Sequence, residues 1–192
     1  MTGYKFTQDW FTHNIPSWEH RLIPMFGRPN LSALEIGCFE GRATVWLLEN
    51  MLTDPSSQIV CIDSFLGGQE HDDKTMEGVE ERFRHNTAKF KSQVKLLKGN
   101  SLDELMLIYH TGHKFDLIYV DGSHKGKDVM ADAIMADKLL KPGGVLIFDD
   151  YEWSPPFEEY ETPRPAIDSF FFLFQNDYLI LDKGYQLMLR KK

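Results

Sequence analysis

Short apolar runs alternate with amphipathic segments along most of the chain. Such short apolar runs are typical of parallel strands that are covered on both faces. The strand candidates are the apolar runs at 31–36, 58–62, 94–98, 115–120 and 144–148. The segments between them repeat their apolar positions with helical spacing, at 42–51, 76–90, 102–109 and 128–140. This regular alternation predicts an α/β fold with a doubly wound, mostly parallel sheet and right-handed crossovers.

The pattern changes at both ends of the chain. An aromatic-rich helix is predicted at 166–176, followed by strands at 178–182 and 185–190 that favour an antiparallel pair. With these two strands the predicted sheet has seven strands and an antiparallel C-terminal strand. Three prolines interrupt residues 1–30, which are expected to form a partly helical cap segment, whereas residues 31–192 are expected to form a single domain.

Composition and charge exclude some of the functions that the protein could have. The 192 residues are 42% hydrophobic and 26% charged, which is ordinary for one globular domain with a core of its own. The net charge of −8 argues against a nucleic-acid partner and against anionic membrane surfaces. The sequence shows neither a signal-like apolar core nor a run that could span a membrane, so we expect a cytoplasmic protein. In that compartment Cys38 and Cys61 should remain reduced and buried.

Three acids come directly after two of the predicted strands. Asp121 follows the run at 115–120, and Asp149 and Asp150 follow the run at 144–148. Because ligands bind outside the carboxyl ends of parallel strands, these acids should converge at one functional edge. Carboxylates this close repel one another unless a positive charge lies among them, and a hard divalent cation fits that need. The alternative is that Asp150 caps a turn and Asp149 binds nothing. We call these three residues the acid cluster.

A glycine-bearing turn follows the first predicted strand. The spacing in Gly37-Cys38-Phe39-Glu40-Gly41 is G-x-x-x-G, and glycines there let the backbone approach a ligand at the start of a helix. The same residues also suit a tight turn without a ligand. Asp63 ends the second strand, where an acid is suited to ribose hydroxyls, although it could equally be a solvated strand end. We call residues 37–41 the glycine turn.

From about residue 31 to 190 the chain resembles class I S-adenosylmethionine-dependent methyltransferases. The order of motifs agrees throughout: E-x-G-x-x-x-G at 35–41, the acid Asp63, Gly99-Asn100-Ser101, Val120-Asp121 and a K-P-G-G segment at 141–144. The resemblance implies a Rossmann-like sheet and binding of S-adenosyl-L-methionine. The cofactor-binding residues that it implies are Glu35, Gly37, Cys38, Phe39, Gly41, Asp63, Ser64, Phe65, Asn100, Ser101 and Asp121. Asn100-Ser101 could also cap the following helix.

Within that superfamily the acid cluster resembles two related groups. Metal-dependent O-methyltransferases carry V-D-A-D-K and Y-D-N-x-x-W, where this chain has V-D-G-S-H at 120–124 and F-D-D-Y-E-W at 148–153. Macrocin-type sugar O-methyltransferases, the methyltransferase family 24-like group, are similar in their D-G-S-H and D-D-Y forms. The resemblance implies a metal site at Asp121, Asp149 and Asp150, with aspartate replacing asparagine at 150. Oxygen ligands favour Mg²⁺, Mn²⁺ or Ca²⁺.

These features predict a methyltransferase that O-methylates a small hydroxylated acceptor. His124, beside Asp121, could accept the acceptor's proton, although a lone histidine is often structural. The loop at 152–165 would form a wall of the acceptor pocket. We expect no nucleic-acid or membrane partner, and the short N-terminal segment suggests that a homodimer completes the pocket. Three alternatives remain: a cofactor-binding protein without methyl transfer, a hydroxylase-like enzyme of the same fold, and a nucleotide-binding module.

Overall fold

The computed structural model describes residues 3–68, 71–154, 158 and 161–192. Seven strands form one sheet in the order β3-β2-β1-β4-β5-β7-β6. Their bounds are β1 Ser32–Ile36, β2 Gln58–Asp63, β3 Val94–Lys98, β4 Phe115–Val120, β5 Leu140–Phe148, β6 Tyr178–Lys183 and β7 Leu187–Lys191.

Strand direction confirms the predicted fold class. Strands β1 to β5 pair in parallel, and β7 runs antiparallel to both β5 and β6. From β1 the order proceeds outward to β2 and β3 on one side and to β4 and β5 on the other. At this reversal the segments that follow β1 and β4 lead to opposite faces of the sheet, and in such sheets ligands bind in the crevice between them.

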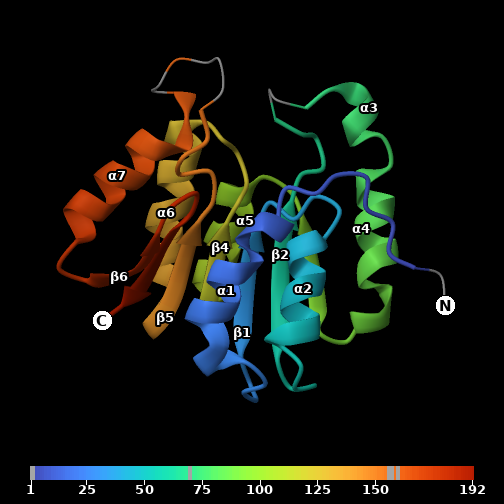
Figure 1. The fold of residues 1–192 in the computed structure, drawn as a ribbon, viewed down its shortest axis with the longest axis horizontal. Helices are drawn as coiled ribbons and strands as arrows, with labels where there is room; N and C mark the ends of the chain where they lie inside the picture. Colours follow the sequence, from blue (N-terminus) through green and yellow to red (C-terminus); the bar gives the residue numbers. More distant parts are fainter. Residues whose placement is uncertain (1–2, 69–70, 155–157, 159–160) are drawn as a thin grey trace.

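Helices cover both faces of the sheet (Figure 1). Helices α1, α2 and α4 contribute to the core on one face, and α5, α6 and α7 contribute to the core on the other. The bounds are α1 Ile15–Leu22, α2 Arg42–Asn50, α3 Asp73–Met76, α4 Val79–Thr87, α5 Ser101–Thr111, α6 Gly126–Leu139 and α7 Pro163–Phe174, with short 3-10 helices at Thr12–Asn14, Ile23–Met25 and Ala88–Phe90. Among the residues that the structure describes, no helix has the length and apolar character of a membrane span.

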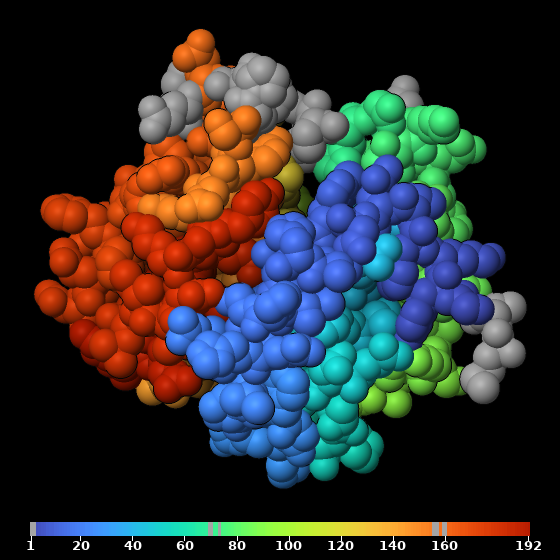
Figure 2. All heavy atoms as spheres, in the orientation of Figure 1, coloured from blue at the N-terminus to red at the C-terminus, as the bar shows by residue number. Residues whose placement is uncertain are grey.

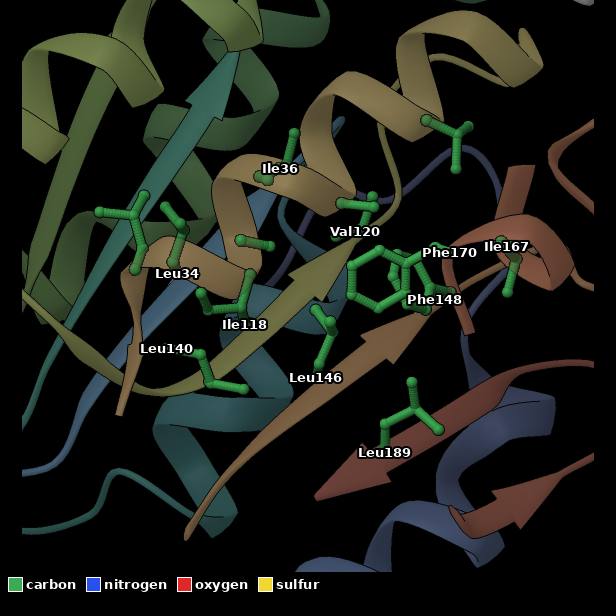
Figure 3. Close-up of a cluster of buried hydrophobic side chains, with 14 of the residues drawn as sticks. Leu34, Ile36, Ile118, Val120, Leu140, Leu146, Phe148, Ile167, Phe170 and Leu189 are labelled. Carbon is green, nitrogen blue, oxygen red and sulfur yellow. The ribbon is translucent and has the colours of Figure 1, made fainter. Parts of the chain in front are cut away.

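Alternate residues of the inner strands serve two cores on opposite faces of the sheet. In β1, Leu34 and Ile36 pack with α5, α6 and α7 in the core shown in Figure 3, whereas Ala33 belongs to the other core. In β4, Ile118 and Tyr119 divide in the same way. Burial on both faces explains why these strands read as unbroken apolar runs. Polar side chains are therefore concentrated where the strands end.

Two helices differ from the prediction for local reasons. The helix expected at 76–90 is interrupted between α3 and α4, where Gly78 has a φ of 68°. A residue in this left-handed conformation cannot continue a right-handed helix. In the cap segment, where the residues from 19 to 25 favour a helix, α1 instead begins at Ile15 and ends at Leu22. Pro16 lies in its first turn, where a backbone N–H has no partner within the helix.

The N-terminal segment, residues 3–14, runs across the surface before entering α1. Figure 2 shows it in dark blue, between the C-terminal half in orange and red and the green α3–α4 region. The backbone N–H of Lys5 donates to Asn86 Oδ1 over 2.7 Å, and Asn86 Nδ2 donates back to the Lys5 carbonyl over 3.0 Å. Helix α1 then inserts Trp18 and Leu22, both fully buried, into the core against the sheet.

Candidate active site

A cavity of about 640 Å³ lies at the carboxyl ends of β1, β2, β4 and β5. Residues 37–40 of the glycine turn and Asp63 line one part of it, whereas Gly41 does not reach it. The acid cluster and His124 line another part, and residues 8–11 and 13 of the N-terminal segment line a third. Residues that the sequence analysis selected from motifs far apart in the chain are therefore brought together around one space. The cavity is large enough for a small-molecule ligand.

The glycine turn brings the chain against the end of β4. Gly37 has a φ of 81°, and a Cβ atom placed there would lie 1.9 Å from the carbonyl oxygen of Asp121. Gly41 has a φ of 79° and Phe39 a φ of 45°, so that three of the five residues are left-handed. Only glycine fits at position 37, because it needs both the conformation and the space. The turn thus holds this end of the cavity directly against the acid cluster.

Asp63 holds the glycine turn in place. Its Oδ2 accepts hydrogen bonds from the backbone N–H groups of Cys38 and Phe39, each over 2.8 Å, and its Oδ1 accepts from Phe65 N over 2.7 Å. The side chain also lines the cavity. That Asp63 faces ribose hydroxyls stays a prediction, whereas its hydrogen bonds to the glycine turn are observed. Three backbone donors orient the carboxylate before any ligand arrives.

Glu35 lies in the cavity lining beneath the glycine turn and is 1% exposed. Thr44 Oγ1 donates to its Oε2 over 2.5 Å, and Cys61 Sγ donates to the same oxygen over 3.8 Å. Burial raises the pKa of Glu35 to about 8, and the charge of Asp63 adds to the rise. Cys38 and Cys61 are free and buried, as expected.

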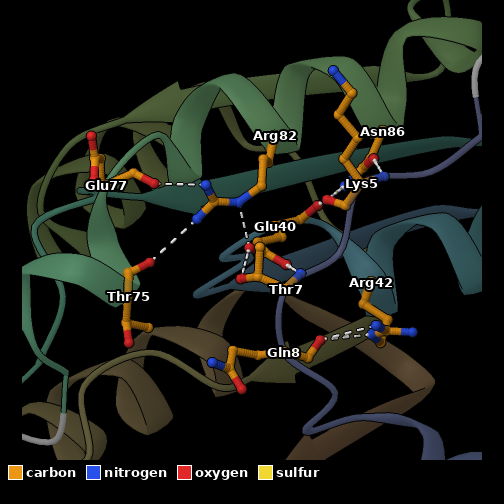
Figure 4. A network of polar contacts seen from close by, with 9 residues as sticks. All are labelled: Lys5, Thr7, Gln8, Glu40, Arg42, Thr75, Glu77, Arg82 and Asn86. Atoms are coloured by element: carbon orange, nitrogen blue, oxygen red, sulfur yellow. Dashed lines mark hydrogen bonds and ion pairs between the residues drawn. The ribbon is translucent and has the colours of Figure 1, made fainter.

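Glu40 is a buried member of the glycine turn that the sequence analysis did not select. Figure 4 shows how it joins three segments. The N–H and hydroxyl groups of Thr7 donate to its two oxygens over 2.6 and 2.5 Å, and Arg82 Nε donates to it over 2.5 Å. Arg82 also donates to the carbonyl groups of Thr75 and Glu77. The sequence signal that could have identified it is an acid directly before the second glycine of the turn, Gly41.

The remaining predicted cofactor residues divide between the cavity and the core. Ser64, Asn100 and Ser101 line the cavity. Asn100 is also the N-cap of α5, since its Oδ1 accepts from Leu102 N over 3.0 Å, so the capping interpretation is confirmed. Phe65 packs its ring on Phe83 with centroids 6.0 Å apart.

The acid cluster converges at the edge of the sheet as the sequence predicts. One ligand atom each from Asp121, His124 and Asp150 lies within 4.8 Å of the others. His124 Nε2 is 2.9 Å from Asp150 Oδ2, and Tyr185 donates to Asp150 Oδ1 over 2.7 Å. We call Asp121, His124 and Asp150 the cation group. It contains a histidine where the sequence analysis expected Asp149.

Asp149 lies behind the cation group with both oxygens engaged. Its Oδ2 shares the hydroxyl group of Tyr119 with Asp121, and its Oδ1 accepts from Asp150 N over 2.8 Å. Burial and the charge of Asp150 raise the pKa of Asp149 to about 7. Burial and the charges of Asp149 and Asp150 also raise the pKa of Asp121 above its usual range. The cluster thus carries more buried negative charge than its neutral donors compensate.

Aromatic side chains surround the rest of the cavity. The Trp153 ring lies 4.7 Å from that of His124, and His13 lies 5.0 Å from Tyr185. Trp10 packs on Phe39 of the glycine turn with centroids 4.9 Å apart. Of the loop expected to wall the acceptor pocket, Trp153 lines this cavity, whereas 155–157, 159 and 160 lie outside the described residues.

Comparison with protein families and curated sequences identifies relatives of most of the chain. Residues 34–151 match the model of a family described as a methyltransferase domain. The Uncharacterized protein R132 of Acanthamoeba polyphaga mimivirus is 30% identical over 142 residues, which are 70% of this chain and 59% of that protein. The chain therefore spans less than two thirds of the length of this curated relative.

Solved structures share the fold over almost the whole chain. An O-methyltransferase from Bacillus cereus, in complex with SAH, matches 97% of this chain and 84% of its own with a TM-score of 0.66 and 22% identity. The MycE methyltransferase from the mycinamycin biosynthetic pathway, in complex with Mg and SAH, matches 96% of this chain and 51% of its own, with a TM-score of 0.65 and 16% identity. At these identities the likeness shows the fold.

Proposed function

The chain belongs to the family of methyltransferase domains, and on this premise we propose that it binds S-adenosyl-L-methionine and methylates an oxygen of a small hydroxylated acceptor with the help of a divalent cation. One observation carries the proposal: a single cavity joins the glycine turn to the acid cluster and His124. A cofactor held at the first end would face an acceptor held at the second. Such placement is the main requirement for methyl transfer.

We propose that the glycine turn and the strand ends hold the cofactor. The preorganised carboxylate of Asp63 would accept the ribose hydroxyls, while Gly37 lets the backbone approach the amino-acid end. Asn100 and Ser101, at the start of α5, would border the adenine ring. When bound, the sulfonium cofactor supplies an electrophilic methyl group. The protein contributes the orientation of that group and the exclusion of water.

The donor set at the acid cluster fits a hard divalent cation. Carboxylate oxygens predominate, the ligand atoms of the cation group lie within 4.8 Å of one another, and the buried charge raises the pKa values of Asp121 and Asp149. We propose that Asp121 and Asp150 hold the ion and that Asp149 supports them. When bound, the ion lowers the pKa of an acceptor hydroxyl group. Mg²⁺ in the MycE complex is consistent with this assignment.

We propose that His124 receives the proton that leaves the acceptor hydroxyl. The Nε2 atom of the ring lies 2.9 Å from Asp150 Oδ2, so that this carboxylate can stabilise the imidazolium that forms. Packing against Trp153 limits rotation of the ring. The oxygen then forms a bond to the methyl carbon as the carbon–sulfur bond breaks, and the proton remains on His124.

We propose that residues 1–30 act as a cap over the cavity. Residues 8–11 and 13 contribute to its lining, and Thr7 is tied to the buried Glu40. The aromatic rings of Trp10, Trp153 and Tyr185 suit the apolar face of a small organic acceptor. A homodimer remains a prediction, which sedimentation of the purified protein would test.

Calorimetric titration with S-adenosylhomocysteine, with and without Mg²⁺, tests the cofactor assignment. We expect micromolar affinity, followed by methyl transfer from labelled S-adenosylmethionine to members of a panel of small vicinal diols and phenols. Absence of binding up to millimolar concentration would contradict the proposal. Binding without transfer to any acceptor, across the panel, would favour a cofactor-binding protein instead.

His124→Gln separates two roles for this histidine. If His124 is the proton acceptor, methyl transfer should fall by at least 10²-fold while Mn²⁺ affinity remains within about threefold of wild type. If it is instead a ligand of the ion, Mn²⁺ affinity falls as well. His110→Gln, at an exposed position of α5, is the matched control and should change neither quantity.

A further inference from the structure

The hydroxyl group of Tyr119 is the point where two members of the acid cluster meet. Tyr119 Oη lies 2.9 Å from Asp121 Oδ2 and is also within hydrogen-bond distance of Asp149 Oδ2. The residue is 1% exposed, so that bulk water does not replace these contacts. The methyl-transfer steps proposed above make no use of this hydroxyl group, although it contacts two residues assigned to the cation site.

Two further side chains, Gln186 and Trp18, help to fix this hydroxyl group. Gln186 Nε2 donates to Tyr119 Oη over 3.5 Å, and Trp18 Nε1 donates to Gln186 Oε1 over 2.6 Å. The indole ring of Trp18 also meets the Tyr119 ring edge-on, with centroids 4.9 Å apart and an interplanar angle of 87°. All three side chains are buried. Helix α1 and the start of β7 therefore set the orientation of a phenol that belongs to β4.

This arrangement determines which carboxylate oxygens can face the cavity. Tyr119 engages one oxygen of Asp121, which leaves the other for the cation group. It also engages Asp149 Oδ2, while Asp150 N donates to Asp149 Oδ1. Without the hydroxyl group, the repulsion between the two buried carboxyl groups would turn them away from each other. A single hydroxyl group thus selects the side-chain conformers of both acids.

We propose that Tyr119 is a positioning residue for the cation site, and that Gln186 and Trp18 hold its hydroxyl group in place. This inference rests on the cation assignment made above, but it does not depend on methyl transfer or on the acceptor. Groups that orient metal ligands from behind commonly change metal affinity by 10–100-fold when they are removed. The same size of effect is expected here.

Tyr119→Phe tests the proposal, with Mn²⁺ alone as the probe and the free ion measured by electron paramagnetic resonance. We expect at least a tenfold loss of Mn²⁺ affinity, with S-adenosylhomocysteine affinity within twofold of wild type. Tyr178→Phe is the matched control. Tyr178 is also buried and donates its hydroxyl group to an aspartate, Asp137, over 2.8 Å, but it lies on β6 away from the cavity. Its loss should leave Mn²⁺ affinity unchanged.

A second measurement needs no metal. Carbon-13 signals of the aspartate carboxyl groups in the metal-free protein report their hydrogen bonding, and the Asp121 and Asp149 signals should move in Tyr119→Phe and remain in place in Tyr178→Phe. Unchanged carboxyl signals in Tyr119→Phe, or wild-type Mn²⁺ affinity, would overturn the proposal. If the wild-type protein itself bound no Mn²⁺, the cation assignment would fail, and the carbon-13 comparison would then decide the positioning role by itself.

Discussion

The glycine turn and the acid cluster both bury carboxylates, but they compensate the charge in different ways. At the turn, Asp63 receives three backbone N–H groups, and Glu40 receives Thr7 and the cation of Arg82. At the acid cluster, three carboxyl groups share tyrosine hydroxyl groups, a backbone N–H and His124, and the pKa values of Asp121 and Asp149 rise.

The glycine turn therefore needs no ligand to satisfy its carboxylates, whereas the acid cluster does. The carboxylates of the turn are oriented and satisfied by the protein, so that the turn can hold its shape before a ligand binds. The acids of the cluster can remain buried only if protons neutralise them or if a cation binds among them. The same type of substitution is therefore expected to change stability and ligand binding differently in the two regions.

Gly37→Ala should have the largest effect, because Gly37 is where the two regions touch. The added methyl group would lie 1.9 Å from the Asp121 carbonyl oxygen, and φ is 81°. We expect a loss of at least about 4 kcal/mol in the free energy of unfolding, measured by urea denaturation. Gly143→Ala is the control, since Gly143 has a similar φ of 78° and open space around it. A cost of about 1–2 kcal/mol is expected there, and equal costs at both positions would contradict the steric argument.

Glu35→Gln should remove a carboxyl group that lies next to the turn yet has only neutral donors, as the acids of the cluster do. Its pKa rises from 4.5 to about 8 on folding, so that the native state holds a proton that the unfolded state releases. This group's contribution to stability is therefore complete below pH 4.5 and is lost as the pH rises toward 8. We expect the variant to gain about 2–4 kcal/mol relative to wild type between pH 5 and pH 8. Denaturation curves at several pH values would show it, and parallel pH profiles would argue against a buried, protonated Glu35.

Asp-to-Asn substitution should have opposite signs in the two regions. Asp63→Asn replaces an acceptor oxygen by an NH₂ group that faces a backbone donor, and we expect it to cost about 1–3 kcal/mol of stability and to weaken S-adenosylhomocysteine binding. Asp149→Asn removes one of several crowded carboxylates and should raise the metal-free protein's stability by about 1 kcal/mol. Thermal unfolding of both variants without metal gives the comparison, and destabilisation of equal size in both would refute it.

The sequence predicted the strands of the sheet and the positions of the acids, but not the residues that contact those acids. Strands β1 and β4 were predictable because burial on both faces leaves apolar runs, and the position of the acid cluster followed from where those runs end. The partners of the acids were not predictable. Glu40 meets Arg82 across 42 positions, and Tyr119 meets Gln186 across 67. Such contacts depend on how α1, α4 and β7 pack against the rest of the protein. A local pattern of residues does not predict this packing.

The division of the helix predicted at 76–90 shows a second limit. Apolar spacing continues through Gly78, so periodicity alone predicts one helix. The backbone instead becomes left-handed at this glycine, and Arg82, in the first turn of α4, reaches back to the carbonyl groups of Thr75 and Glu77. The helix is interrupted where hydrogen bonds from the Arg82 side chain replace backbone hydrogen bonds of a helix.

Calorimetric titration of the protein with Mg²⁺ at pH 6.5, in two buffers of different ionisation enthalpy, tests the central claim that the acid cluster is completed by a cation. Because the pKa values of Asp121 and Asp149 are raised, the cluster should release about one proton when the ion binds, so that the observed heat should differ between the buffers. Saturable binding with proton release is the predicted result. The absence of Mg²⁺ binding, or binding whose heat is the same in both buffers, would contradict the account.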